Sequence, residues 1–438
     1  MSPSPSGALA TPERNVRALL HDRNYLCIWG VGGLTGIVRW LQLLVMGVYT
    51  FETTGSPLLV SLIPILWMAP LALCGPLVGV YADRVNRRTF LLVGLALIFG
   101  LSVTMATIAF SGALTFLHVA VAAALSGLFW ATDMPVRRRF MGDLAGDSLS
   151  TAMSLDSATG NATRMAGPFL GGIMLQLFNM TGVFILSSVL FAACFLLVLT
   201  IRSPGRRETG TRAPAFLSDL LAGIRFVSSD ANLRRIFAVT IIFNLFGFPF
   251  TSMVPVLGRA QLDLSAVLVG LLSSMEGLGA FLGATMVAIF ARPAYFQLIY
   301  VGGTTAYLCM LGYLSVLTFV AGGPLHSFLA TSATLVVIGT CSACFAAMQS
   351  TLTYLGAPPA LRSRVLGVLT LCIGTGPLGF FNIGIMAEAF GVPTALGVSA
   401  LEGLLVLGVL WAFGGRRESG SKTETVAQFP GQTSVSAR

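Results

Sequence analysis

The chain has 438 residues, of which 55% are hydrophobic and only 10% are charged, and its mean hydropathy is +0.85. Soluble globular proteins carry about 25% charged residues, so this composition excludes a protein covered by a polar surface in water and indicates one that lies in lipid. The net charge of +9 comes from arginines in short loops between apolar runs, which is typical of the cytoplasmic loops of membrane proteins and does not favour nucleic-acid binding.

Residues 1–23 form a polar N-terminal tail, and runs long enough to cross a bilayer as helices follow it. A crossing takes about 20 largely apolar residues, and each run should be helical because lipid offers the backbone no hydrogen-bond partners. We expect an all-α membrane protein with twelve transmembrane helices at about 24–50, 57–82, 89–110, 113–133, 151–178, 181–201, 236–257, 266–290, 294–320, 327–355, 365–390 and 394–413.

An arginine-rich linker, residues 202–235, divides these helices into two bundles of six, residues 24–201 and 236–415, and a tail of residues 416–438 follows. Inside the linker, apolar residues recur at helical spacing from Phe216 to Val227. This pattern predicts an amphipathic helix, which either lies along the inner membrane surface or packs on the bundle.

The distribution of arginine predicts that both termini are cytoplasmic. With the N-terminus inside, the inner loops and tails hold nearly all of the positive residues, and the outer loops hold Arg259 alone. Cytoplasmic loops carry such an excess of Lys and Arg.

The stretch between the second and third runs contains Gly79, Asp83, Arg84, Arg87 and Arg88. A glycine-spaced apolar run ends here at an acid that three arginines follow within five residues. We interpret the stretch as a helix that reaches water on the cytoplasmic side.

The fifth run contains the motif Gly167-Pro168-x-x-Gly171-Gly172. Glycines let neighbouring helices approach closely and slide, and Pro168 cannot donate a backbone hydrogen bond. The motif predicts a helix contact that moves; tight packing without motion is the alternative.

Both motifs resemble those of the major facilitator superfamily: the first resembles the loop between helices two and three, and the second the fifth-helix signature associated with antiporters. Two smaller features, Pro135-Val136-Arg137 and Pro358-Pro359 to Val365, resemble the enterobactin-exporter and macrolide-efflux branch. The resemblance implies a bacterial inner-membrane transporter that exports bulky amphipathic molecules, siderophore-like or drug-like, in exchange for protons. It implies no cofactor beyond the proton gradient, and a substrate site between two repeats near the bilayer midplane.

The resemblance further implies that Gly79, Asp83 and the three arginines form a cytoplasmic gate. Its charge pairs would join the two halves in the outward-open state only, as alternating access requires. Simple solvation of an interfacial carboxylate is the alternative.

Ionisable residues within the runs are the candidates for substrate binding and proton coupling. A charge near the bilayer centre costs about 2.5–3.5 kcal/mol on insertion scales, so each one calls for a partner or a cavity. We expect Arg39 and Arg164 to line a central cavity and to meet the substrate or an acid such as Asp133. Glu276 is the candidate for the carboxylate that takes up the proton, and Asp156 lies on the same small, polar face of its helix as Arg164. Fixed ion pairs between helices are the alternative.

Catalysis and metal binding are not expected, because His21, His118 and His326 lie far apart and no nucleophile has a base beside it. Two other functions stay open: an uptake permease for a small metabolite, and a non-transporting sensor or lipid-handling protein on the same scaffold. The expected partners are the lipid bilayer, a small-molecule substrate and protons, and the expected state is a monomer.

Overall fold

The computed structural model describes residues 16, 19–82, 86–201, 216–318, 324–359 and 361–415, and within these ranges it contains helices and no β-strand. Ten helical runs in the described residues are long and apolar enough to cross a membrane. The first half of the chain forms α2 (Arg23–Thr54), α3 (Pro57–Ala82), α4 (Arg87–Phe110), α5 (Phe116–Ala145), η1 (Gly146–Ser148) and α6 (Leu149–Thr200).

The second half begins with α7 (Phe216–Ser229) and then a continuous helical run that changes its winding several times. This run consists of α8 (Ala231–Ile242), η2 (Phe243–Gly247), η3 (Phe248–Met253), α9 (Val254–Val256) and η4 (Leu257–Gln261). The remaining elements are α10 (Ala266–Phe290), η5 (Pro293–Tyr295), α11 (Phe296–Leu317), α12 (Pro324–Gly356), α13 (Arg362–Ile373), α14 (Gly376–Phe390) and α15 (Val392–Gly415).

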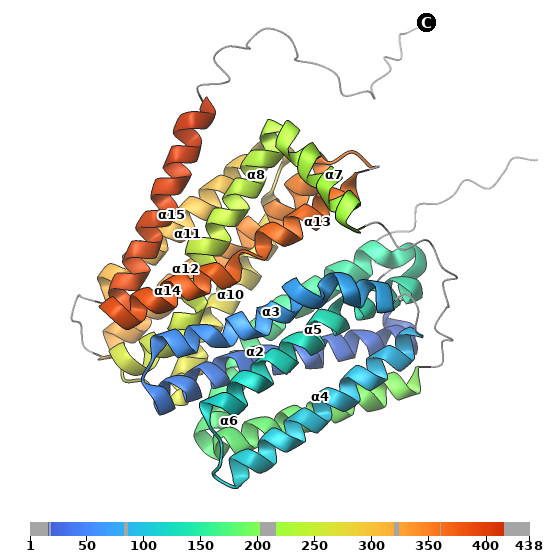
Figure 1. Ribbon diagram of the computed structural model, residues 1–438, viewed down its shortest axis with the longest axis vertical. Helices are drawn as coiled ribbons and strands as arrows, with labels where there is room; N and C mark the ends of the chain where they lie inside the picture. Colours follow the sequence, from blue (N-terminus) through green and yellow to red (C-terminus); the bar gives the residue numbers. More distant parts are fainter. Residues whose placement is uncertain are drawn as a thin grey trace, which may run out of the picture.

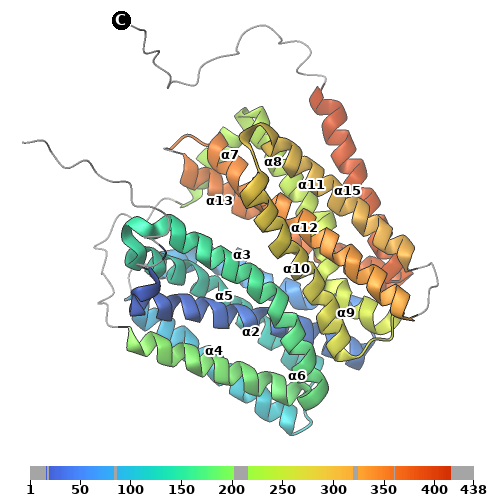
Figure 2. The same cartoon turned by 180° about the vertical axis from the view of Figure 1, so that it is seen from behind.

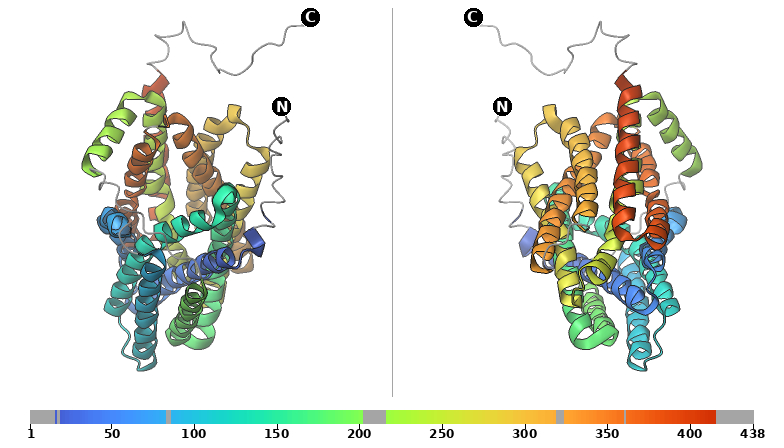
Figure 3. Two further views of the ribbon diagram at one scale, coloured as in Figure 1. Left: turned by 90° about the vertical axis from the view of Figure 1, so that its right-hand side faces the viewer. Right: turned by 90° about the vertical axis from the view of Figure 1, so that its left-hand side faces the viewer.

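The helices form two groups that lie side by side, α2–α6 and α8–α15 (Figures 1 and 2). The two groups meet where α6 packs on α10 and α3 packs on α14. From this contact they diverge toward the side on which α7 lies (Figure 1). Figure 3 shows the two groups from the sides of the molecule.

Helix α6 is a single run of 52 residues that turns back on itself at Asn179. Asn179 has φ 55° and ψ −165°, which are not helical values, and it separates two helices. The turn falls between the fifth and sixth expected runs. These angles of Asn179 lie outside the left-handed helical region in which Asn is enriched.

Helix α5 is longer than the sequence predicts. The expected run ends at residue 133, but the helix continues through Pro135 to Ala145. Proline removes one backbone hydrogen bond, and buried charge pairs compensate on the same segment: Arg137 lies one turn after Asp133, and its Nε donates to the Asp133 carboxylate at 3.3 Å. The prediction of a helix end at Asp133 is therefore wrong.

Helix α7 packs on α13 and α8 (Figure 1). A Cβ on Gly223 would lie 2.7 Å from the backbone oxygen of Arg364, so the two backbones touch at this glycine. The helix thus contacts the bundle, and its position relative to the membrane surface stays a prediction.

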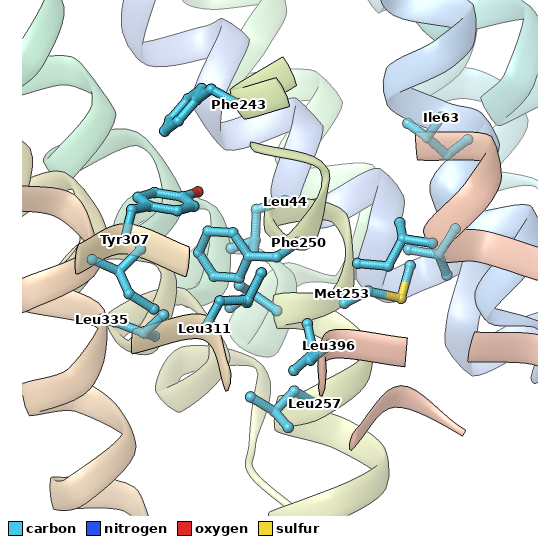
Figure 4. Packing of buried hydrophobic residues seen from close by; sticks show 14 of the residues in the cluster. Leu44, Ile63, Phe243, Phe250, Met253, Leu257, Tyr307, Leu311, Leu335 and Leu396 are labelled. Atoms are coloured by element: carbon cyan, nitrogen blue, oxygen red, sulfur yellow. The ribbon is translucent and has the colours of Figure 1, made fainter. Parts of the chain in front are cut away.

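The buried core crosses from one group of helices to the other. In Figure 4, Phe250 and Tyr307 of the second group lie near Leu44 of α2, and the two rings meet edge to face with centroids 5.8 Å apart. Large apolar side chains also cover the outside of the described helices, where Leu97, Val189 and Leu405 are more than half exposed. A surface of this kind is suited to lipid.

Candidate functional site

A cavity of about 370 Å³ lies between the two groups of helices. The first group contributes residues of α2, α3, α5 and α6, and the second contributes residues of η2, η3, α9, α10, α12, α13 and α14. The lining is mainly apolar and aromatic, with few polar side chains: Arg39, Arg164, Asn244, Thr251, Ser252, Ser273, Glu276, Ser342 and Gln349. An apolar cavity with a few polar groups is the usual form of a small-molecule site.

The wall on the side of the first group combines arginine with tryptophan. The guanidinium of Arg39 lies 4.9 Å from the ring centroid of Trp40 and 5.5 Å from that of Trp130. Arg164 lies over Trp40 at 5.2 Å, and Trp67 packs against Trp130 with centroids 4.4 Å apart. The structure therefore brings Arg39 and Arg164 to one cavity wall, as expected for substrate-binding residues.

An ion pair between Arg164 and Glu276 joins the two groups at the cavity. The Nη2 of Arg164 on α6 donates to the Oε1 of Glu276 on α10 at 2.5 Å, and Glu276 is only 6% exposed. The helices touch at this level, because a Cβ on Gly277 would lie 2.7 Å from the backbone oxygen of Arg164. The sequence predicts both residues as candidates, but it does not predict that they pair.

A second charge cluster lies inside the first group. Arg137 contacts Asp133 at 3.3 Å and Asp156 at 2.9 Å, and Arg138 contacts Asp156 at 2.9 Å. These residues surround a small chamber of about 70 Å³ that Arg39 and Trp130 also line, so the chamber adjoins the central cavity. Arg137 thus brings Asp133 and Asp156 together in a cluster that is separate from the ion pair of Glu276.

Sequence reasoning missed Arg137 as a site residue. Its signal was the four-residue spacing from Asp133, which places the two on one helix face, but the expected helix end at residue 133 concealed it. The cavity residues Trp67, Asn244 and Gln349 were also missed. Asn244 lies in the π-helical turn η2, a type of turn that is frequent at functional sites and has no sequence signature in this chain.

We name the end of the molecule at which α2 ends and α3 begins the Glu52 end. Polar contacts join the two groups of helices there. Glu52 pairs with Arg259 of η4. Glu388 of α14 accepts a hydrogen bond of 2.7 Å from the Ser56 hydroxyl and one of 3.1 Å from the Leu58 backbone N–H.

The glycine–proline motif of α6 faces two helices. A Cβ on Gly172 would lie 2.5 Å from the backbone oxygen of Ala266 at the start of α10, and a Cβ on Gly270 would lie 2.6 Å from that of Pro168. Gly167 and Gly171 instead touch the backbone of α2 near Leu41. The motif thus holds α6 in backbone contact with its own group and with the other group.

The expected gate is only partly within the described residues. Asp83 and Arg84 lie outside them, and Gly79 lies in α3. Arg87 pairs with Asp143 of α5, and Arg88 donates to the backbone oxygens of Val198 and Leu199 on α6 at 3.2 and 2.7 Å. These contacts of the two arginines stay within the first group, and the role of the motif as a gate stays a prediction.

Comparison with known proteins gives consistent matches. The staphyloferrin A transporter of Staphylococcus aureus is 21% identical over 382 residues, which cover 85% of this chain and 92% of the transporter. The multidrug efflux pump Tap of Mycolicibacterium fortuitum is 25% identical over 372 residues, or 83% and 88% of the two chains.

Solved structures match over most of their length. The nucleoside transporter NupG superposes with a TM-score of 0.71 at 13% identity, covering 89% of this chain and 98% of NupG. A bacterial homologue of the human lysosomal transporter Spinster, in an inward-facing and unoccupied conformation, gives 0.65 at 16% identity, covering 93% and 97%. The family model of the Major Facilitator Superfamily matches residues 28–380. The helical fold, the cavity between two groups of helices and this match lead to one conclusion: the chain is a multi-pass membrane protein that belongs to the Major Facilitator Superfamily, a family of transporters.

Proposed function

We propose that this protein exports a bulky amphipathic small molecule, siderophore-like or drug-like, from the cytoplasm in exchange for protons, by alternating access. It lies in a bacterial inner membrane as a monomer with twelve crossings and both termini in the cytoplasm. The names of the two relatives, a siderophore transporter and a drug efflux pump, support the class of substrate.

The helix bounds support the count of twelve. The long run α6 turns at Asn179 and supplies two crossings, and α3, with 26 residues, is long enough for one more. The topology that these crossings imply leaves Arg259 as the one positive residue of the outer loops, in agreement with the excess of Lys and Arg in cytoplasmic loops. In this topology the Glu52 end faces outside.

The ion pair between Arg164 and Glu276 is the observation that carries the proposal. It connects two groups of helices that alternating access moves apart, so its formation depends on the conformational state. An adjacent arginine favours the ionised form of a carboxylate, and burial without a partner favours the protonated form. Glu276 is therefore expected to take up a proton when the halves open to the outside, and to lose it when Arg164 returns.

This order of events gives exchange. The contacts of Glu52 and Glu388 close the outer side in the state described, so substrate enters from the cytoplasm. The step to the outward-open state carries the substrate and breaks the ion pair, and the return step carries the proton on Glu276. The motif from Gly79 to Arg88 closes the cytoplasmic side in the outward-open state.

Substitution Glu276→Gln tests the coupling. In proteoliposomes, a pH gradient that is acidic on the side of the Glu52 end should drive substrate movement by the wild-type protein and not by the variant, because glutamine cannot carry a proton. Exchange of labelled for unlabelled substrate without a gradient should persist. Glu402→Gln is the matched control, since Glu402 on α15 accepts a hydrogen bond of 3.3 Å from Asn382 and does not line the cavity.

Equal pH-driven transport by wild type and Glu276→Gln would contradict the assignment of the proton to Glu276. Movement of substrate toward the cytoplasm under the physiological gradient would instead favour an uptake permease. If the folded, reconstituted protein moves no substrate, a sensor or lipid-handling role is favoured.

A further inference from the structure

Arg39 is the charged residue of the cavity that lacks an ion-pair partner within the described residues. Its guanidinium lies over the rings of Trp40 and Trp130, and its Nε is buried without a hydrogen-bond partner. A cation over an aromatic face gains about 0.5–2 kcal/mol, which is less than a buried carboxylate partner would supply. The arginine is therefore held in place but not neutralised.

The nearby carboxylates contact other arginines. Asp133 and Asp156 contact Arg137, Asp156 also contacts Arg138, and Glu276 contacts Arg164. This part of the bundle therefore holds four arginines and three carboxylates. The arginines are Arg39, Arg137, Arg138 and Arg164, and the carboxylates are Asp133, Asp156 and Glu276. With every group ionised, one positive charge remains, and it lies at Arg39 beside the cavity.

The remaining walls show what kind of molecule the cavity can accept. Trp40, Trp67 and Trp130 present flat apolar surfaces around Arg39. The opposite wall, from the second group, carries phenylalanines, the Glu276 carboxylate that Arg164 holds, and neutral hydrogen-bonding groups. Among the neutral groups is the hydroxyl of Ser273, which is buried and has no partner among the described residues. The cavity thus presents the cation of Arg39 among aromatic side chains, and the one carboxylate in the described part of its lining, Glu276, is already paired with Arg164.

We propose that the cavity binds an organic anion, with its carboxylate or similar anionic group at Arg39 and its planar, apolar part against the three tryptophans. The proposal rests on the transport function proposed above and names the substrate class. Arg39 has donors in a planar fork that matches a carboxylate. Because the anion binds at Arg39, the ion pair of Arg164 with Glu276 stays intact when the substrate binds from the cytoplasm.

Equilibrium binding to the purified full-length protein in detergent tests the proposal, with naphthalene-2-carboxylate and its uncharged isostere naphthalene-2-carboxamide as probes. The wild-type protein should bind the carboxylate at least about tenfold more tightly than the amide, which corresponds to about 1.4 kcal/mol. Quenching of tryptophan fluorescence and equilibrium dialysis provide two independent readouts.

In Arg39→Gln this preference should fall to about onefold, and Arg39→Lys should keep a part of it because the charge remains. Arg362→Gln is the matched control: Arg362 also lies over an aromatic ring, 4.0 Å from the centroid of Tyr354, but outside the cavity. Size-exclusion chromatography identifies any variant that has lost its fold. If Arg39→Gln is such a variant, Arg39→Lys replaces it in the test, and its carboxylate preference should be smaller than that of the wild-type protein but still present.

Equal binding of the two probes by the wild-type protein would overturn the proposal, as would an unchanged preference in Arg39→Gln. Loss of the preference in Arg164→Gln alone would place the anion at Arg164 and contradict the assignment to Arg39. The assay needs no gradient, so its outcome is independent of transport. Glu276→Gln should keep the carboxylate preference even though it loses pH-driven transport.

Discussion

Arg137 and Arg164 both bind buried carboxylates, and they differ in what they connect. Arg137 joins Asp133 of its own helix to Asp156 of the adjacent helix, within one group. Arg164 joins α6 to α10 of the other group. In the proposed cycle, the first arrangement stabilises a unit that moves as a whole, whereas the second forms and breaks as the units move.

Substitution Arg137→Met should destabilise the protein by about 3–5 kcal/mol, because it removes the arginine partner of the buried Asp133 carboxylate and leaves Asp156 with Arg138 alone. Arg138→Met should cost about 0–1 kcal/mol, since the side chain of Arg138 is 44% exposed. Thermal unfolding in detergent compares the two variants. A larger loss of stability in Arg138→Met would contradict the central role of Arg137.

Residue types could be predicted from the sequence better than their pairing. Arg39, Arg164 and Glu276 stand out because charges are rare in apolar runs, and all three line the cavity. That Arg164 meets Glu276 depends on where α6 crosses α10, and no local pattern determines this crossing.

At the scale of helices, α6 and α10 approach so closely that their backbones touch. Pro168 and Gly172 of α6 face Gly270 of α10, so the contact leaves no room for a side chain on Gly270. The same contact lies near the Glu52 end, where the two groups are also joined by polar contacts. Helix packing at this position therefore favours the state that is closed at that end.

Substitution Gly270→Val should push α6 and α10 apart and increase the population of the state open at the Glu52 end. Pulsed electron paramagnetic resonance can measure this between spin labels at Leu177 and Leu325, both more than 60% exposed and one in each group, in a background without the native cysteines. The mean distance should increase relative to the unsubstituted protein.

Gly100→Val on α4 is the matched control, because a Cβ there would have no atom within 4 Å. An unchanged distance in Gly270→Val, or an equal change in Gly100→Val, would contradict the role of the α6–α10 contact.

The helices themselves could be predicted from apolar runs, and α10 has the expected bounds of residues 266–290. The predicted end of α5 is wrong, because Asp133 and Arg137 are buried as an ion pair within the continuing helix. The turns η2 and η3 are not predicted either, although Pro249 and Pro255 interrupt the run from Ala231 to Gln261, and proline cannot donate a backbone hydrogen bond.

At the scale of the whole molecule, the two groups of helices meet at the Glu52 end and diverge toward the other (Figure 1). Alternating access requires that a second set of contacts replaces the first when the groups move. The contacts of Arg87 with Asp143 and of Arg88 with the end of α6 lie within the first group, and we propose that the motif containing these two arginines closes the other end.

The missing counter-ion of Arg39 has an electrical consequence for the transport cycle. With an anion bound, Arg39 is neutralised and the Arg164–Glu276 pair is neutral, so the loaded protein moves no net charge through its conformational change. The return step moves the bare charge of Arg39 together with the proton. One cycle of the proposed exchange would therefore move two elementary charges inward, one for the exported carboxylate and one for the proton, and an inside-negative membrane potential of 100 mV would contribute about 2.3 kcal/mol for each.

Imposed potassium diffusion potentials in proteoliposomes measure this transfer. The potential at which net substrate flux stops should correspond to two charges per carboxylate exported, and to one charge when the exported molecule is the neutral amide. Equal values for the two substrates would contradict the exchange of one proton for each exported molecule. A transporter built in this way draws on membrane voltage through an arginine that has no partner until its substrate arrives.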